Sequence, residues 1–136
     1  MPTMMTRPSL AWRETKKDMA AQVAAGTREE NWAEHLWPEA AVEAIDAVLV
    51  AYETEAAALV ADGAAPGDDA VLAVAERAVT GLNAADEEHG IIETTEREEL
   101  CEYIEAVLEA HGVDVTGLAA RRGFDPGDLA GLWRDW

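Results

Sequence analysis

The sequence predicts an all-α protein: a compact antiparallel bundle of about four main helices, with short additional helices at its ends. Three observations lead to this fold class. Apolar residues recur three and four positions apart over long stretches, which places them on one face of a helix. Glycine and proline residues separate these stretches, as they do where helices stop and start. No run has the apolar-polar alternation of a β-strand, so a sheet has no support.

The first half of the chain predicts two substantial helices. One is expected over residues 9–25, because a Pro-Ser pair suits its start and Gly26 suits its end. Thr27 and Glu30 have the spacing of a capping box for a short helix toward Leu36. Pro38 then begins a long helix over residues 38–62. The apolar stripe of this helix consists of Val42, Ile45, Leu49, Tyr52, Ala56 and Leu59.

The second half of the chain predicts two more substantial helices. Asp68 or Asp69 caps a helix that ends at Gly90. Its alanine-rich stripe allows neighbouring helices to approach closely, so we expect this helix to be central and tightly packed. Thr95 and Glu98 predict a capping box for a fourth helix that Gly112 ends. A short helical turn is expected over residues 116–122, and Asp125-Pro126 predicts a last helix that ends in the segment 133–136.

Length and composition predict one globular domain over residues 1–136. A chain of this length can bury enough surface for its own core, and 49% of its residues are hydrophobic. The start of the chain lacks the apolar core of a secretory signal, and no stretch reaches membrane-spanning length. With a single cysteine, Cys101, interpreted as a small buried apolar residue, we expect a cytoplasmic protein. The many alanines and the preference for arginine over lysine suggest a bacterial source.

The charge limits the partners that the protein can bind. A formal net charge of -18 disfavours nucleic acids and anionic membranes, and it leaves a basic protein, a cation or simple solubility. Residues 83–114 carry eleven carboxylates against one base. We expect the fourth helix to turn Glu99, Glu102, Glu105 and Glu109 outward to engage a basic partner, as an immunity-like inhibitor module does. Residues 1–28 hold five bases and two acids, so a homo-oligomer formed head to acidic helix is the alternative.

A search for chemistry finds no cofactor motif and no metal site. The paired Glu-x-x-His motifs of a ferritin-like dimetal site are absent. The stretch Glu98-Glu99-Leu100-Cys101-Glu102 resembles the first acidic motif of all-α nucleotide pyrophosphohydrolases related to MazG. That resemblance implies a magnesium-dependent enzyme as the alternative function, in which grouped carboxylates hold the ion over a triphosphate. The second motif of that family, a Glu-x-x-Asp on the following helix, is missing.

The tryptophans lie near the two ends of the chain. Trp12, Trp32 and Trp37 fall in the first third, and Trp133 and Trp136 fall at the end of the sequence. If the two groups meet, they plug an open end of the bundle, because each large ring needs burial and an acceptor for its N–H. The alternative is a pocket or a partner-binding hot spot, where tryptophan is enriched.

A second resemblance concerns residues 38–136. The segment Ile92-Glu93-Thr94-Thr95-Glu96-Arg97-Glu98, an upstream Asn83 and the final Arg-Asp-Trp look like a family of small bacterial proteins known only as a domain of unknown function. The chain departs from the family in a Gly-Phe-Asp-Pro-Gly insertion. The resemblance implies a helical fold and a bacterial origin, and no activity. From the residues themselves, Glu93 and Arg97 pair at a helix start, or they converge with Asn83 and Trp136 in a small polar binding site.

Overall fold

The computed structural model describes residues 5–136 and confirms the all-α prediction. No β-strand occurs among the described residues. In chain order, the elements are α1 (Pro8–Ala24), α2 (Ala33–Leu36), α3 (Glu39–Leu59), α4 (Asp68–His89), α5 (Thr94–Ala110), α6 (Val115–Arg122) and the 3-10 helix η1 (Ala130–Leu132).

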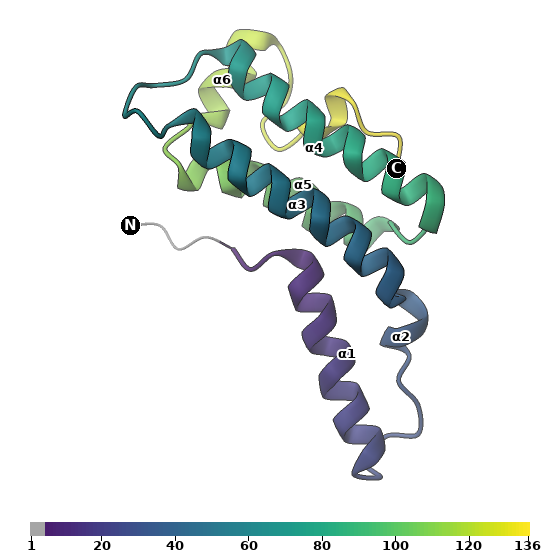
Figure 1. The fold of residues 1–136 in the computed structure, drawn as a ribbon. Helices are drawn as coiled ribbons and strands as arrows, with labels where there is room; N and C mark the ends of the chain where they lie inside the picture. The colour runs from purple at the N-terminus through teal and green to yellow at the C-terminus, as the bar shows by residue number, and fades with distance from the viewer. Residues whose placement is uncertain (1–4) are drawn as a thin grey trace.

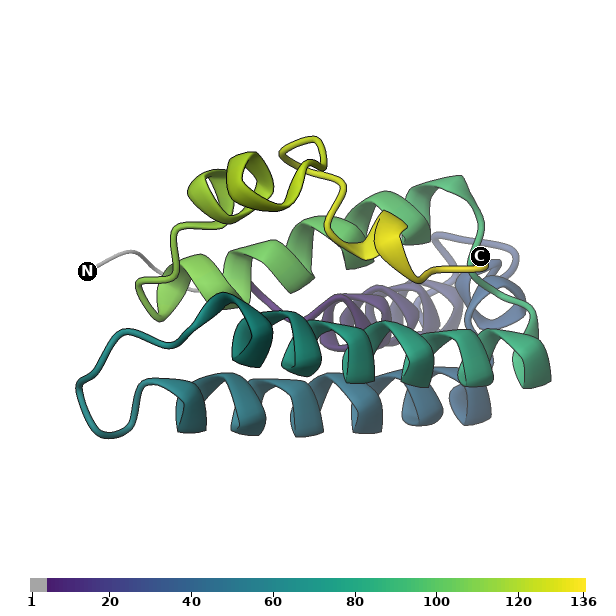
Figure 2. The ribbon, with the colours of Figure 1, turned by 90° about the horizontal axis from the view of Figure 1, so that it is seen from above.

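The body of the molecule consists of α3, α4 and α5; α4 runs antiparallel to α3, and α5 runs antiparallel to α4 (Figure 2). After α6 the chain turns back, so that the segment 123–136 runs along α5 in the opposite direction (Figure 2). The first half of α1 packs against the body, whereas its second half extends away from it (Figure 1). Residues 20–27 are accordingly all exposed. This arrangement leaves one flank of α5 beside the C-terminal segment and the other beside α1.

One continuous apolar core joins these helices, and it contains the two predicted stripes. The predicted stripe of α4 is fully buried, and so is that of α3 except the partly buried Leu59. The α4 stripe consists of Val71, Ala75, Ala78, Leu82 and Ala85. Gly81 lies inside α4 at its contact with α3. A Cβ atom there would lie 3.0 Å from Cγ1 of Val48, so the absent side chain permits the close approach of the two helices.

Several of the element boundaries predicted from the sequence are wrong. The helix predicted over 38–62 ends at Leu59, and the helix expected to begin at Thr27 covers only Ala33–Leu36. The capping box of α5 is formed by Glu93 and Glu96, whose Oε1 accepts the N–H of Glu93 at 3.1 Å. It is not formed by the Thr95–Glu98 pair, because the helix begins at Thr94. The expected last helix is reduced to the three residues of η1.

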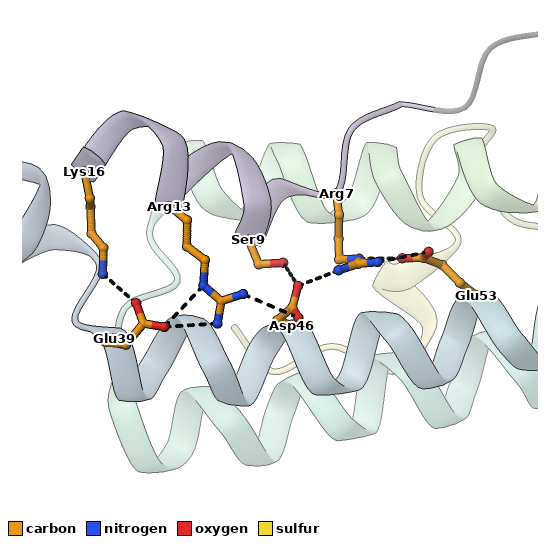
Figure 3. A network of polar contacts seen from close by, with 7 residues as sticks. All are labelled: Arg7, Ser9, Arg13, Lys16, Glu39, Asp46 and Glu53. Atoms are coloured by element: carbon orange, nitrogen blue, oxygen red, sulfur yellow. Dashed lines mark hydrogen bonds and ion pairs between the residues drawn. The ribbon is translucent and has the colours of Figure 1, made fainter. Parts of the chain in front are cut away.

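A row of ion pairs fastens α1 to α3, as Figure 3 shows. Arg7 donates to Oε2 of Glu53 at 2.6 Å and to Oδ1 of Asp46 at 2.8 Å. Ser9, whose side chain is buried, donates to the same Asp46 oxygen at 2.6 Å. Farther along α1, Arg13 and Lys16 both donate to Glu39. We call these seven residues the α1–α3 clamp.

The clamp changes how the basic start of the chain is interpreted. Three of its five bases, Arg7, Arg13 and Lys16, contact carboxylates of α3 in the same chain. They are therefore engaged within the molecule, and a head-to-acidic-helix homo-oligomer stays a prediction. None of the helices in the described part of the chain is long and apolar enough to cross a membrane.

Candidate functional site: an acidic groove along α5

A groove of about 560 Å³ lies between α5 and the C-terminal segment. We call it the α5 groove. Its carboxylates are Glu98, Glu102, Glu105, Glu109 and Asp128. The rest of its lining is formed by Arg97, Cys101, Ala106, Gly127, Arg134 and Met5.

The spacing of the glutamates along α5 explains why they share the groove. They follow one another at intervals of four, three and four residues, which is the repeat that keeps side chains on one helical face. The opposite face carries Leu100, Ile104 and Leu108, all of them fully buried. Burial of this apolar face therefore fixes the direction of the acidic one.

Glu105 is not the outward-facing carboxylate that the sequence predicts. Its residue is only 9% exposed, and a carboxylate oxygen accepts the backbone N–H of Gly127 at 3.2 Å. Burial raises the pKa of the Glu105 carboxyl above its ordinary value, although backbone N–H groups of Gly127 and Leu129 oppose the rise. Neighbouring charges of Glu109 and Asp128 raise this pKa further. Glu105 thus anchors the C-terminal segment and forms the floor of the groove.

Glu99 is the second correction to the predicted acidic face. Its carboxylate accepts the indole N–H of Trp12 at 3.3 Å, and it does not line the groove. At 100° of rotation per residue, position 99 lies to one side of the row formed by the other glutamates, on the side that contacts α1. Glu102 and Glu109 are exposed, as predicted. The acidic face of α5 therefore consists of Glu98, Glu102 and Glu109 with Glu105 beneath them.

The predicted convergence of polar residues near the end of the bundle is partly present. Asn83 donates to the backbone oxygen of Trp133 at 3.0 Å, and its Oδ1 accepts the N–H of Asp135 at 3.1 Å. Arg97 donates to the backbone oxygen of Trp136 at 3.2 Å. Both side chains thus hold the C-terminal segment in place. Glu93 is used elsewhere, as the N-cap of α5, and makes no ion pair with Arg97 in the described structure.

The tryptophans form two groups, one on each flank of α5. Trp12 and Trp37 stack with ring centroids 5.7 Å apart, and Trp32 lies 6.3 Å from Trp37. Trp136 is buried on the other flank, where the guanidinium of Arg134 lies 5.9 Å from its ring. No ring contact joins the two groups within residues 5–136. The two groups are linked through the first turn of α5, where Glu96 accepts the N–H of Trp37 at 3.4 Å and the next residue, Arg97, holds Trp136.

Cys101 lies in the wall of the groove and is half-buried. Desolvation raises the pKa of its thiol, and the nearby charges of Asp128 and Glu105 act in the same direction. Arg134 and Arg97 oppose this rise. A raised pKa disfavours the thiolate, the form that acts as a nucleophile.

The glutamates of the motif that resembles the first acidic motif of the pyrophosphohydrolases do not all face the same way in the structure. Glu98 and Glu102 line the groove, whereas Glu99 contacts Trp12 on the neighbouring flank. The carboxylate that faces them, Asp128, comes from the segment after α6 and not from α3 or α4. Among the described residues, no group of three or more His, Cys, Asp or Glu side chains is arranged to hold a metal ion.

Three charged residues of the groove, Glu98, Asp128 and Arg134, are not among the binding residues predicted from the sequence, where Glu98 belongs to the acidic motif of the enzyme alternative. Glu98 continues the spacing of Glu102, Glu105 and Glu109, so the helical repeat contains the signal for it. Asp128 and Arg134 lie in a segment without periodicity, and only the return of the chain along α5 brings them to the groove. In comparisons with protein-family models, curated proteins and solved structures, none matched the chain. The resemblance to the domain of unknown function therefore stays a prediction.

Proposed function

We propose that this protein is a non-catalytic binding module of the inhibitor or immunity-like type, whose α5 groove receives a basic segment of a partner protein. The observation that supports this function best is the lining of the groove, which has five carboxylates around a concave surface. Glu102 and Glu109 are exposed and make no ion pair in the described structure, so they are free to pair with a lysine or an arginine. Pairing with basic side chains is the chemistry for which this surface is suited.

The charge of the whole chain supports the same function. A net charge of -18 attracts a basic partner over distances larger than the groove itself, which speeds the encounter and makes it dependent on salt. The groove then supplies the local contacts that a uniform negative surface lacks. A cytoplasmic location in a bacterium belongs to this proposal and rests on residue usage in the sequence.

Calorimetric titration with a defined peptide tests the proposal. The probe is Lys-Arg-Lys-Arg-Lys with a C-terminal amide, titrated at low and at raised NaCl concentration. We expect the Glu102→Gln/Glu109→Gln protein to bind it about fivefold more weakly than the wild type, the loss that corresponds to two exposed ion pairs. Binding to the wild type should weaken steeply with salt.

The matched control is Glu43→Gln/Glu76→Gln, which removes two exposed carboxylates from α3 and α4. Its net charge equals that of the groove variant, but its substitutions lie outside the groove. Affinity close to the wild-type value is expected. Equal weakening in both variants would show that the peptide senses only overall charge, and absence of binding would reject the proposed function outright.

A further inference from the structure

Glu105 is a buried carboxylate at the floor of the α5 groove, and the fold gives it no counterion. Its residue is only 9% exposed, yet it lines the groove. It accepts the backbone N–H of Gly127 at 3.2 Å. None of the ion pairs in the described structure includes Glu105. A buried charge without a counterion is unfavourable, because water no longer solvates it.

The acidic groups that face Glu105 add to this cost. Glu109, one turn farther along α5, and Asp128, in the C-terminal segment, are both negative, and their charges raise the pKa of Glu105. From α3, Tyr52 faces the same carboxyl, and its hydroxyl donates to the backbone oxygen of Ile104 at 2.6 Å. Burial and the charge of Glu105 raise the pKa of this hydroxyl, so it stays neutral and brings no positive charge.

The arginines of the groove do not supply the missing counterion. Arg97 and Arg134 line the groove, but both donate to the oxygen of Trp136, at 3.2 and 2.7 Å. Neither is among the groups that set the pKa of Glu105. Burial raises the pKa of the Cys101 thiol in the groove wall, so this group adds no charge either. A cation that enters the groove from outside is therefore the counterion that Glu105 lacks.

We infer that a basic segment entering the α5 groove displaces a proton from Glu105, so that the protein binds its partner more tightly as pH rises through the range in which Glu105 ionises. This inference rests on the proposed function and specifies how the groove is regulated. A basic side chain held between Glu102 and Glu109 lies within about one helical turn of Glu105 on the same face. Its charge favours the ionised carboxylate, and the proton passes to the solvent. Glu102 and Glu109 are exposed, so water solvates their charges with or without a ligand.

The number of protons released on binding measures this coupling directly. The probe is the amide of Lys-Arg-Lys-Arg-Lys with an acetylated N-terminus, because none of its groups titrates in weak acid. It is titrated by calorimetry into the wild-type protein at about pH 5.5, above the ordinary glutamate pKa of about 4.3. The titration is made once in acetate and once in MES, two buffers that differ in ionisation enthalpy. The difference between the two binding heats gives the proton count, and we expect release of about 0.3 proton per peptide.

Glu105→Gln assigns the proton, because an amide does not titrate. We expect this variant to release almost none, whereas Glu43→Gln, which removes an exposed carboxylate outside the groove, should release as much as the wild type. A histidine that lost a proton on binding would do so in all three proteins. The ratio of wild-type affinity to Glu105→Gln affinity should rise from about one at about pH 4.5 to about fivefold at about pH 7.5.

Equal proton release by the wild type and a folded Glu105→Gln protein, or no release by the wild type, would overturn the inference. Circular dichroism establishes whether the variant folds. If it does not, the carboxyl ¹³C shift of Glu105 in the wild-type protein decides: the peptide should move its titration to lower pH, and an unmoved titration contradicts the inference. Salt-sensitive binding that the Glu102→Gln/Glu109→Gln change weakens, without proton release from Glu105, would leave the proposed function standing. Failure of the peptide to bind would reject both.

Discussion

Glu105 lies where α5 meets the C-terminal segment, and its carboxylate has two roles. It accepts the N–H of Gly127, which fixes the return of the chain. It also lines the α5 groove beside Cys101 and Asp128. Burial of an ionised carboxyl is unfavourable, and this cost raises the pKa of Glu105. Glu105 therefore attaches the C-terminal segment and also gives the groove a carboxyl group whose pKa is raised.

The raised pKa gives Glu105 a predictable effect on stability. Since the folded protein holds this proton more tightly than the unfolded chain does, the contribution of Glu105 becomes more favourable as pH falls through the folded pKa, and it is least favourable above that value. Glu105→Gln keeps an oxygen for Gly127 and removes the buried charge. We expect this substitution to raise the free energy of unfolding at pH 7 by about 1 kcal/mol, or roughly 4 °C in melting temperature.

Thermal unfolding followed by circular dichroism at pH 7 and in acid measures this gain. The control is Glu102→Gln, which removes the same charge from an exposed position on the same helix and is not among the charges that raise the pKa of Glu105. The gain of the Glu105 variant should shrink toward acid pH, where the wild-type carboxyl also becomes neutral. A large loss of stability at pH 7 would mean that the charge of Glu105 is needed to hold the C-terminal segment.

At the scale of elements, α1 is the helix that depends most on polar contacts. Its first half inserts Trp12, 2% exposed, against Trp37, and the ion pairs of the α1–α3 clamp fasten the same half to α3 (Figure 3). Its second half contacts little, since residues 20–27 are all exposed. By contrast, α3, α4 and α5 bury continuous apolar stripes. The attachment of α1 should therefore respond to pH and charge more than the packing of the other helices does.

Asp46 is the carboxylate on which the clamp depends most. Burial opposes its ionisation, but hydrogen bonds from Ser9 and Arg7 and the charges of Arg7 and Arg13 outweigh burial and lower the pKa of Asp46. Its contribution is therefore fully present above the unfolded pKa, about 4, and is lost as pH falls through the lower folded pKa. Asp46→Asn should reduce the free energy of unfolding by about 2 kcal/mol at pH 7, because Arg7 and Ser9 lose a partly buried charged acceptor.

Urea unfolding followed by tryptophan fluorescence measures this change, because Trp12 reports on the position of α1. Glu55→Gln serves as the control, since it breaks the exposed pair with Arg77 and should cost less than about 1 kcal/mol. The difference between the Asp46 variant and the wild type should shrink as pH falls through the lowered folded pKa of Asp46. A difference that persists unchanged in acid would show that packing, and not charge, holds α1 in place.

At the scale of the whole molecule, repulsion between carboxylates opposes the folded state. The chain has 28 acidic residues and 10 lysines and arginines, and local ion pairs such as those of the clamp and the Arg121–Asp68 pair compensate only part of this excess. Carboxylates without an ion pair in the described structure are most closely spaced along α5 and at the end of α4. Compaction brings these charges closer together than they are in the unfolded chain, which lowers stability.

Added salt should therefore stabilise the protein. Raising NaCl from about 10 mM to about 300 mM shortens the screening length from roughly 30 Å to below 10 Å, which weakens the distant repulsions more than the close ion pairs. We expect the melting temperature to rise by about 5 °C. Scanning calorimetry measures this shift, and a matched series in glycerol separates screening from general solvent effects. A fall in melting temperature would show that the ion pairs of the α1–α3 clamp outweigh the repulsion.

The sequence alone determined the fold class and the course of the long helices. The stripes of α3 and α4 repeat with the helical period, and Gly90 and Gly112 mark two ends of helices. These are local signals, because they depend on residues within one turn of each other. On α5 the sequence predicted an acidic face of Glu99, Glu102, Glu105 and Glu109, of which Glu102 and Glu109 are exposed in the structure.

Only the tertiary structure decided what those faces contact. The segment after α6 has no helical period, so nothing in the sequence indicated that it returns along α5, buries Glu105 and brings Asp128 and Arg134 to the groove. The clamp joins Arg7 to Asp46 and Glu53 across about forty positions of the chain. Contacts of this kind depend on how the helices pack, because they join residues far apart in sequence that no local repeat relates.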